Sequence, residues 1–476
     1  MKILQADKST EKVGLREKVA YGFGDAAFSM FWKLFTMYLL FFYTDVVGIG
    51  AAVVGTMIFV TRFWDAFLDV GIGIMADRTK SRWGMFRPYL LWGAIPFGLV
   101  GVLTFTAPEL SATGKIVYAY ISYSLMMVVY SLLNVPYASL LGVMTPDSKV
   151  RTQLSSYRMI FAFIGSIVVL LLVEPLVELF SKWNVSGTEV NLKFGWQMSA
   201  IVFSILAVVL LLLCFAWTKE RVKPIKQAKN PIKTDLKDLL INKPWWILLG
   251  ASISTLMFNS IRDGVAVYFF KYNVVETHLF HISFMNTNLA LITVYLVLGQ
   301  AANIVGILLT SPVSNKIGKR ATFFAAMAIA TVFSVLFYFL DYSNIPLILV
   351  FQFIISICAG AVTPLLWSMY ADIADYSEWK TGRRATGLIF SASSMSQKLG
   401  GALGVAVVGW LLAYFGYVSG AEQSAHTQTG IQMMMSIFPA IATFVSAGFM
   451  FFYNITESKL KEISVELDAS RQNEEE

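Results

Sequence analysis

The chain has few charged residues and only two cysteines, and each shortage excludes a class of protein. Asp, Glu, Lys and Arg make up 14% of its 476 residues, whereas soluble domains carry about 25%. Cys214 and Cys358 both lie within apolar segments, so neither a disulfide framework nor a metal site is expected. The sequence contains no phosphate-cradling loop and no nucleophile–base set. We therefore expect no enzymatic activity and no cofactor.

Long apolar segments are what the chain has instead. Apolar residues make up 57% of the sequence, and the mean hydropathy is +0.64. A membrane-spanning helix needs about 20 mostly apolar residues, and strand-type alternation is missing. The composition predicts an all-α membrane protein, without a cleaved signal peptide. Its twelve transmembrane helices are expected at residues 19–46, 51–76, 86–107, 116–144, 153–176, 195–217, 245–271, 284–311, 321–341, 345–371, 385–415 and 430–453.

Basic residues alternate between the predicted loops. The loops after the second, fourth, sixth, eighth and tenth spans are rich in Lys and Arg, and the loops between them are not. The positive-inside rule then places both termini in the cytoplasm. The longest such loop divides the spans six and six. We expect a cytoplasmic segment at 1–18, six-helix bundles at 19–217 and 245–453, a basic middle loop at 218–244 and a cytoplasmic tail at 454–476.

Three charged residues lie where the second span should be apolar: Arg62, Asp65 and Asp69. Two residues four apart share one face of a helix, and ionised groups at membrane depth usually face a bundle interior or a water-filled cavity. Two such carboxylates can bind a monovalent cation, or hold and release a proton. The alternative is a structural ion pair between Asp65 and Arg62.

Six motifs in a fixed order resemble a known family. They are YGFGDAAF (21–28), YTDVVG (43–48), RFWDAFLD (62–69), DRTKSRWGMFRP (77–88), NVPYASL (134–140) and ADIADYSEWKTGRRATG (371–387). The set is similar to that of the glycoside–pentoside–hexuronide:cation symporters, which include melibiose permease, over nearly the whole chain. The resemblance implies a twelve-helix major facilitator fold with two six-helix halves. It also implies sugar uptake driven by Na⁺, H⁺ or Li⁺.

The resemblance assigns the coupling-cation site to Asp65 and Asp69, with Ser131 on the fourth span as a hydroxyl ligand. Two departures bear on the choice of cation. Melibiose permease has Asn where this chain has Leu68, and Thr where it has Ser131. The lost amide leaves both Na⁺ and H⁺ open as the coupling cation.

Sugar recognition requires polar groups that bind vicinal hydroxyls and an aromatic face for the ring. Arg158 and Lys398 match basic residues of the family, whereas Ser29 and Asn134 replace its two sugar-binding Asp residues. The galactoside contacts are therefore not preserved, and melibiose is not the expected substrate. The remaining candidates for substrate binding are Trp64, Tyr130 and Ser394.

Two further basic residues, Lys33 and Arg262, lie within predicted spans. Together with Arg158 and Lys398 they would suit an acidic sugar such as a uronide. The alternative, which we favour, is that both are paired structurally, Arg262 with Asp263 or with a neighbouring helix.

Charged residues at the predicted cytoplasmic ends of helices are candidates for a gate. Ion pairs between helix ends can form in one state and break in the other; plain positive-inside anchoring is the alternative. The candidates are Asp25 in a network with Arg62, and the loop residues Asp77, Arg78, Asp375, Glu378 and Arg384.

The sequence thus predicts a cation-coupled importer of a sugar or glycoside (pentoside, hexoside or hexuronide). It would act in the bacterial inner membrane, as a monomer in contact with lipid and without nucleic acid. A facilitator or exporter is the first alternative, and a membrane sensor is a weaker one.

Overall fold

The computed structural model describes residues 13–145, 148–183, 190–221, 239–274, 278–282, 287–381 and 386–456, and seven residues of 458–466. In chain order, its helices and strands are α1 (Leu15–Lys33), η1 (Leu34–Tyr38), α2 (Leu39–Phe41), η2 (Phe42–Val46), α3 (Ala51–Arg78), α4 (Arg87–Thr104), α5 (Ala112–Met144), α6 (Ser148–Trp183), α7 (Leu192–Trp217), α9 (Lys243–Asn273), β1 (His278–Ile282), β2 (Thr287–Ala290), α10 (Leu291–Ile317), α11 (Lys319–Phe337), α12 (Ile345–Thr381), α13 (Thr386–Tyr414), α14 (Ala425–Met435) and α15 (Ile437–Phe452).

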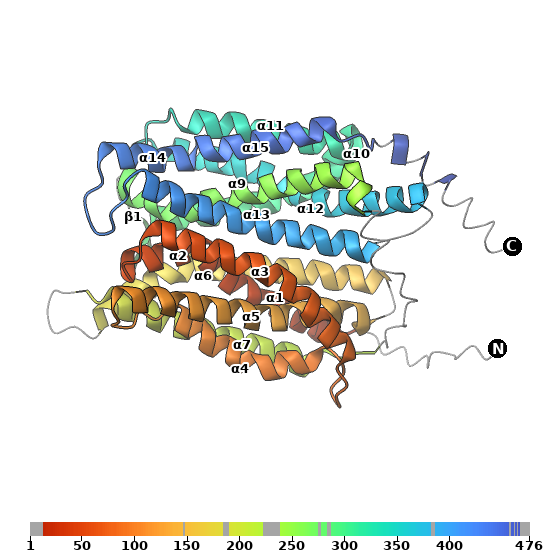
Figure 1. Cartoon of the computed structure of the whole chain (residues 1–476), viewed down its shortest axis with the longest axis horizontal. Coiled ribbons are helices and arrows are strands. Elements are labelled where there is room, and N and C mark those ends of the chain that lie inside the picture. The colour runs from red at the N-terminus through yellow and green to blue at the C-terminus, as the bar shows by residue number, and fades with distance from the viewer. Residues whose placement is uncertain are drawn as a thin grey trace.

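The long helices run side by side along one axis (Figure 1). Within the described residues, 10 helical segments are long and apolar enough to cross a membrane. Helices α4 and α9 occupy the places of the third and seventh predicted spans, within a few residues at each end. The chain is therefore a multi-pass helical membrane protein, as its apolar runs predict.

The helices form two halves. In Figure 1, α1–α7 lie in the lower half and α9–α15 in the upper half. Within the first half α1 packs against α6 and α7, and within the second α9 packs against α13 and α15. Across the boundary α3 packs against α13, η1 against α9, and α6 against α10. We call the end of the bundle with β1 and β2 the hairpin end, and the opposite end, where α1 begins and α15 stops, the termini end.

The first span is not a regular α-helix. Two π-helical turns, η1 and η2, interrupt it. In each turn a threonine hydroxyl donates to main-chain carbonyls: Thr36 to those of Trp32 and Lys33, and Thr44 to those of Leu40 and Phe41. Such back-bonding bends helices, and π-turns are frequent at functional sites. The turn η1 packs against α9 of the other half, and Thr44 of η2 is hydrogen-bonded to Tyr268 of α9.

The connection before α10 contains a short hairpin that the sequence did not predict. Strands β1 and β2 pair antiparallel, with His281 opposite Asn288. The eighth span was placed at 284–311, but α10 begins at Leu291. Short apolar runs do not distinguish strand from helix by periodicity, which is why the pattern here was misleading.

Two glycines allow α3 and α13 to touch near the hairpin end. A Cβ on Gly409 would lie 2.6 Å from the Ala51 carbonyl oxygen, and one on Gly55 would lie 2.9 Å from the Ala406 carbonyl oxygen. Backbone contact of this kind requires small residues. The two halves are therefore closely apposed at this end of the bundle.

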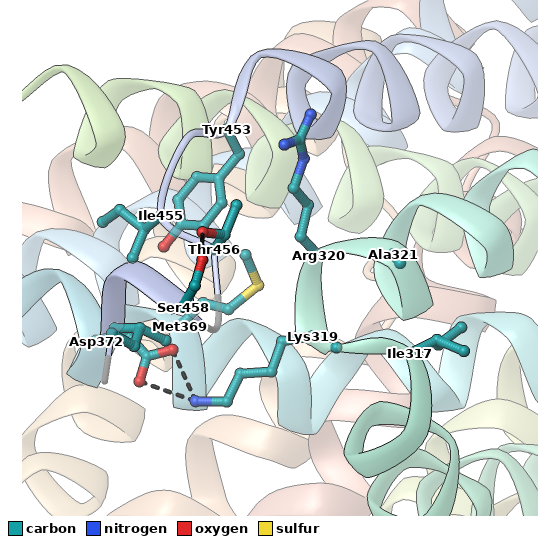
Figure 2. Close-up of a pocket in the computed structure, with 12 residues that line it drawn as sticks. Ile317, Lys319, Arg320, Ala321, Met369, Asp372, Tyr453, Ile455, Thr456 and Ser458 are labelled. Atoms are coloured by element: carbon teal, nitrogen blue, oxygen red, sulfur yellow. Dashed lines mark hydrogen bonds and ion pairs between the residues drawn. The ribbon is translucent and has the colours of Figure 1, made fainter. Parts of the chain in front are cut away.

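A cavity of about 320 Å³ lies at the termini end of the second half. Figure 2 shows Lys319 reaching across it to both oxygens of Asp372, at 2.8 and 2.7 Å. Arg320 donates to the carbonyls of Met450 and Phe451. These bonds join α11 to α12 and α15, and none of the predicted site residues lines the cavity.

Candidate functional site

The two carboxylates of the second span meet one ammonium from the other half. Lys398 Nζ on α13 lies 3.1 Å from Asp65 Oδ2 and makes a close contact with Asp69 Oδ2. It also lies 3.4 Å from Ser131 Oγ, which donates to Asp65 Oδ1 at 2.6 Å. Asp65 and Asp69 therefore share one face of α3, as their spacing predicts. Lys398 was predicted as a substrate ligand, but here its partners are the predicted cation ligands.

One oxygen of this cluster is left over. Asp69 Oδ1 is buried and has no hydrogen-bond partner in the described part of the chain. A buried acceptor without a partner costs about 1–3 kcal/mol, and more when it is charged. The cluster therefore has free capacity for a cation or a proton at Asp69.

Arg62 does not form the ion pair with Asp65 that the sequence left open. Its Nε donates to the Tyr123 hydroxyl at 2.9 Å, and its guanidinium lies 4.2 Å from the centre of the Trp32 ring. A cation–π contact of this kind contributes about 0.5–2 kcal/mol. Arg62 thus balances the cluster from within the first half, without direct contact with its carboxylates.

Asp25 forms an ion pair with Arg158 instead of a network with Arg62. Arg158 Nε lies 3.1 Å from Asp25 Oδ2, and Nη2 lies 3.4 Å from Oδ1. This forked geometry is the strong form of a carboxylate–guanidinium pair. Asp25, Ser29 and Lys33 follow each other at four-residue spacing and so share one face of α1.

Lys33 and Arg262 are both engaged, in agreement with the alternative that the sequence favoured. Lys33 Nζ lies 3.1 Å from Asp263 Oδ2 and joins the two halves. Arg262 donates to the Tyr295 hydroxyl, the Gln352 amide oxygen and the Met435 carbonyl, at 2.6, 2.8 and 2.9 Å. The partner of Asp263 is thus Lys33 and not Arg262.

The remaining predicted substrate residues have mixed surroundings. The Tyr130 ring packs against Phe28 and Trp32, and Trp64 is half-buried on α3. Ser29 and Asn134 are half-buried and have no hydrogen-bond partner in the described part of the chain. Ser394 lies on α13, but its side chain falls outside the described residues.

Three of the predicted gate residues are described at the termini end. Arg78 is exposed at the end of α3, and Asp375 and Glu378 lie near the end of α12. The side chain of Asp77 and the whole of Arg384 fall outside the described residues. Their role as a gate remains a prediction.

A polar network at the hairpin end was missed by the sequence reasoning. Asp45 accepts from Lys271 at 2.8 Å and from the Tyr417 hydroxyl at 2.7 and 2.8 Å. Beside it, Thr44 and Tyr268 share a hydrogen bond of 2.7 Å. Each of these bonds joins the first half to the second. Asp45 belongs to the quoted motif YTDVVG, but only the fold brings its partners together.

Comparison with known proteins identifies the family of this chain. Residues 20–457 match the family described as MFS/sugar transport proteins. The chain belongs to this family. It is 36% identical over 460 residues to the inner membrane symporter YicJ of Escherichia coli, with 96% of each chain covered. It is 37% identical to the isoprimeverose transporter of Lactiplantibacillus pentosus, over 94% of this chain and 90% of that one.

A solved structure supports the fold of this MFS/sugar transport protein. A bacterial homologue of the lysosomal transporter Spinster superposes with a TM-score of 0.65 at 14% identity, over 92% of this chain and 95% of that chain. This structural similarity supports the major facilitator fold and nothing beyond the fold. Family membership makes the chain a transporter of small molecules, which confirms that it is not an enzyme.

Proposed function

We propose that this MFS/sugar transport protein carries a sugar or glycoside into the cell together with a cation, by alternating access. The observation that carries the proposal is the cluster of Asp65, Asp69, Ser131 and Lys398. It joins the two halves in the middle of α3 and α13. A cation bound at this position would interact with charged residues of both halves.

The donor set fits a monovalent cation or a proton. Carboxylate and hydroxyl oxygens are the hard ligands that such cations prefer, and Asp69 Oδ1 has no partner within the described residues. Lys398 supplies the positive charge that a coupling cation would supply. Arrival of the cation would then release Lys398 from the carboxylates, which links cation binding to a change at the contact between halves.

The sugar would bind between the halves beside this cluster. Ser29 and Asn134 offer unpaired polar groups from α1 and α5, and the fork of Asp25 and Arg158 lies on the same face of α1. The relatives named as a symporter and as an isoprimeverose transporter support this substrate class. The expected location is the bacterial inner membrane, with the termini end in the cytoplasm.

Uptake into proteoliposomes tests the proposal directly. Wild-type protein and the Asp69→Asn variant would be given a panel of neutral and acidic glycosides under imposed Na⁺ or H⁺ gradients. We expect gradient-driven accumulation by the wild type, and its loss in the variant because the cation loses a charged ligand. Exchange of sugar without a gradient should persist in the variant, and this serves as the folding control.

Two outcomes decide against the proposal. Accumulation by Asp69→Asn would refute the cation assignment. Indifference of the wild type to every sugar in both gradients would refute the substrate class, while equal uptake without any gradient would indicate a facilitator.

A further inference from the structure

A second polar cavity lies at the boundary between the halves. Its volume is about 40 Å³, and it lies between Met37 of η1 and helices α9, α10 and α12. The Lys33–Asp263 pair is at its edge, because Asp263 lines it and Lys33 is one turn before Met37. No residue of the Lys398 cluster lines this cavity.

Three amide side chains lining the cavity lack partners. Asn259, Gln300 and Asn303 make no hydrogen bond within the described residues. Gln300 is only 8% exposed. Lipid supplies no hydrogen bonds at this depth, and a buried amide left unpaired costs about 1–3 kcal/mol. Gln300 is buried and Asn259 and Asn303 are half-buried around the same space. Their convergence indicates that polar atoms of a ligand, or water held in its place, complete them.

The charged groups of the cavity are mostly paired. Asp263 Oδ2 is paired with Lys33, and Arg262 donates to Tyr295, Gln352 and Met435. What remains unpaired within the described residues is Asp263 Oδ1 and the three amides, each of which presents one acceptor and two donors. A hydroxyl group can donate to the amide and carboxylate oxygens and accept from the amide N–H groups, whereas a carboxylate can only accept and would face Asp263. The lining therefore favours a neutral hydroxylated ligand.

The position of the cavity extends the proposed sugar site. Asp25, Ser29 and Lys33 form one stripe along α1, and eight residues of helix span about 12 Å. Arg158 and Asn134 lie towards one end of the stripe, and the amide cavity lies at the other. A volume of about 40 Å³ admits hydroxyl substituents but no complete ring. The ring that carries them would lie between the halves.

We propose that Asn259, Gln300 and Asn303 form a subsite that binds the hydroxyl groups of a second, neutral sugar unit, whose ring lies outside the cavity between the halves. The transported substrate is then a glycoside of two linked units. This inference rests on the proposed function, since it assumes that the first unit binds between the halves.

Binding of paired ligands to the purified protein tests the subsite. Each pair would consist of a methyl glycoside with one ring and a disaccharide with the same first ring, for example methyl xyloside with xylobiose and methyl glucoside with cellobiose. The variants are Gln300→Leu and Asn303→Leu. The matched control is Gln432→Leu, which removes an amide bonded to the Tyr338 carbonyl, away from the cavity.

The readout is the ratio of the two affinities within each pair. We expect each variant to weaken disaccharide binding about tenfold more than methyl glycoside binding, because one hydrogen bond to the second ring is lost. The control should leave the ratio unchanged. Gly299→Ala gives an independent check, since its Cβ would lie 2.5 Å from the Gln352 amide nitrogen and so crowd the cavity wall.

The outcomes separate this inference from the proposed function. Suppose that wild-type protein binds sugars but the affinity ratio does not change in Gln300→Leu, Asn303→Leu or Gly299→Ala. The subsite is then wrong, and the proposed function stands. If wild-type protein binds neither member of any pair and transports neither, the proposed function falls and the subsite falls with it.

Discussion

At the scale of single residues, Lys398 holds the place of a cation. Its ammonium contacts Asp65, Asp69 and Ser131 together, and its side chain is 16% exposed. Breaking a buried ion pair by removing one partner costs about 3–5 kcal/mol. The two carboxylates would then need another positive charge, and the coupling cation is the available one.

The Lys398→Gln variant should therefore depend more on the cation for its stability. We expect a lower melting temperature than wild type in choline chloride, and a larger rise when Na⁺ is added or the pH is lowered. Thermal unfolding of purified protein in detergent would measure both. The matched control is Lys319→Gln, which removes the ammonium of the Lys319–Asp372 pair in the cavity at the termini end. An equal response to the cation in both variants would contradict the substitution of Lys398 for a cation.

Residue partners were the part that the sequence predicted least well. The i,i+4 spacing placed Asp65 and Asp69 on one face, and the single ammonium that contacts both confirms that geometry. The spacing could not predict that Lys398 is their partner, because 329 residues separate Asp69 from Lys398. The pairs Asp25–Arg158 and Lys33–Asp263 were missed for the same reason. Which helix faces which is decided by packing of the whole bundle.

At the scale of helices, apolar length was a reliable guide and local detail was not. Runs of about 20 apolar residues require a helix in lipid, because every main-chain polar group must be bonded internally. Each predicted span therefore coincides with a helical segment, but the bounds differ by up to ten residues, as at the end of α12. The π-turns η1 and η2 depend on threonine hydroxyls inside an apolar run, and the hairpin before α10 depends on pairing between short segments. Neither leaves a clear periodic signal.

The Asp45 network joins the two halves at the hairpin end, and we expect it to stabilise the closed form of this end. Asp45 is 5% exposed and accepts from Lys271 and Tyr417 across the boundary between halves. Hydrogen bonds to charged groups are worth about 1.5–3 kcal/mol each. Losing them should shift the balance between closed and open hairpin ends by roughly tenfold or more.

The Asp45→Asn variant should open this end more often. Spin labels on cysteines at Glu109 and Glu422, both exposed at the hairpin end in opposite halves, would report the distance between halves. We expect a larger population at long distance in Asp45→Asn than in the parent. Asp341→Asn is the control, because Asp341 accepts from the nearby Ser343 main-chain nitrogen within its own turn. Identical distance distributions in all three proteins would show that Asp45 does not stabilise the closed hairpin end.

At the scale of the whole molecule, the contacts between halves are unevenly distributed. The Asp45 network and the contact between Gly55 and Gly409 lie at the hairpin end, and the Lys398 cluster and the Lys33–Asp263 pair lie nearer the middle. Near the termini end, the pairs Glu17–Arg221 and Lys319–Asp372 each join segments of the same half. Within the described residues, this is the arrangement expected of a carrier closed at the hairpin end. Alternating access then requires the Asp45 bonds to break while bonds at the termini end form.

The positive-inside rule assigns the basic termini end to the cytoplasm. The hairpin end, where the Asp45 network joins the halves, would then face the outside of the cell. Single cysteines at Glu109 and at Lys80, exposed at opposite ends, would be treated with a membrane-impermeant maleimide. The native Cys214 and Cys358 are buried and should give little background. We expect labelling at 109 in intact cells and at 80 only in inside-out vesicles; the reverse pattern would invert the orientation and place the hairpin end in the cytoplasm.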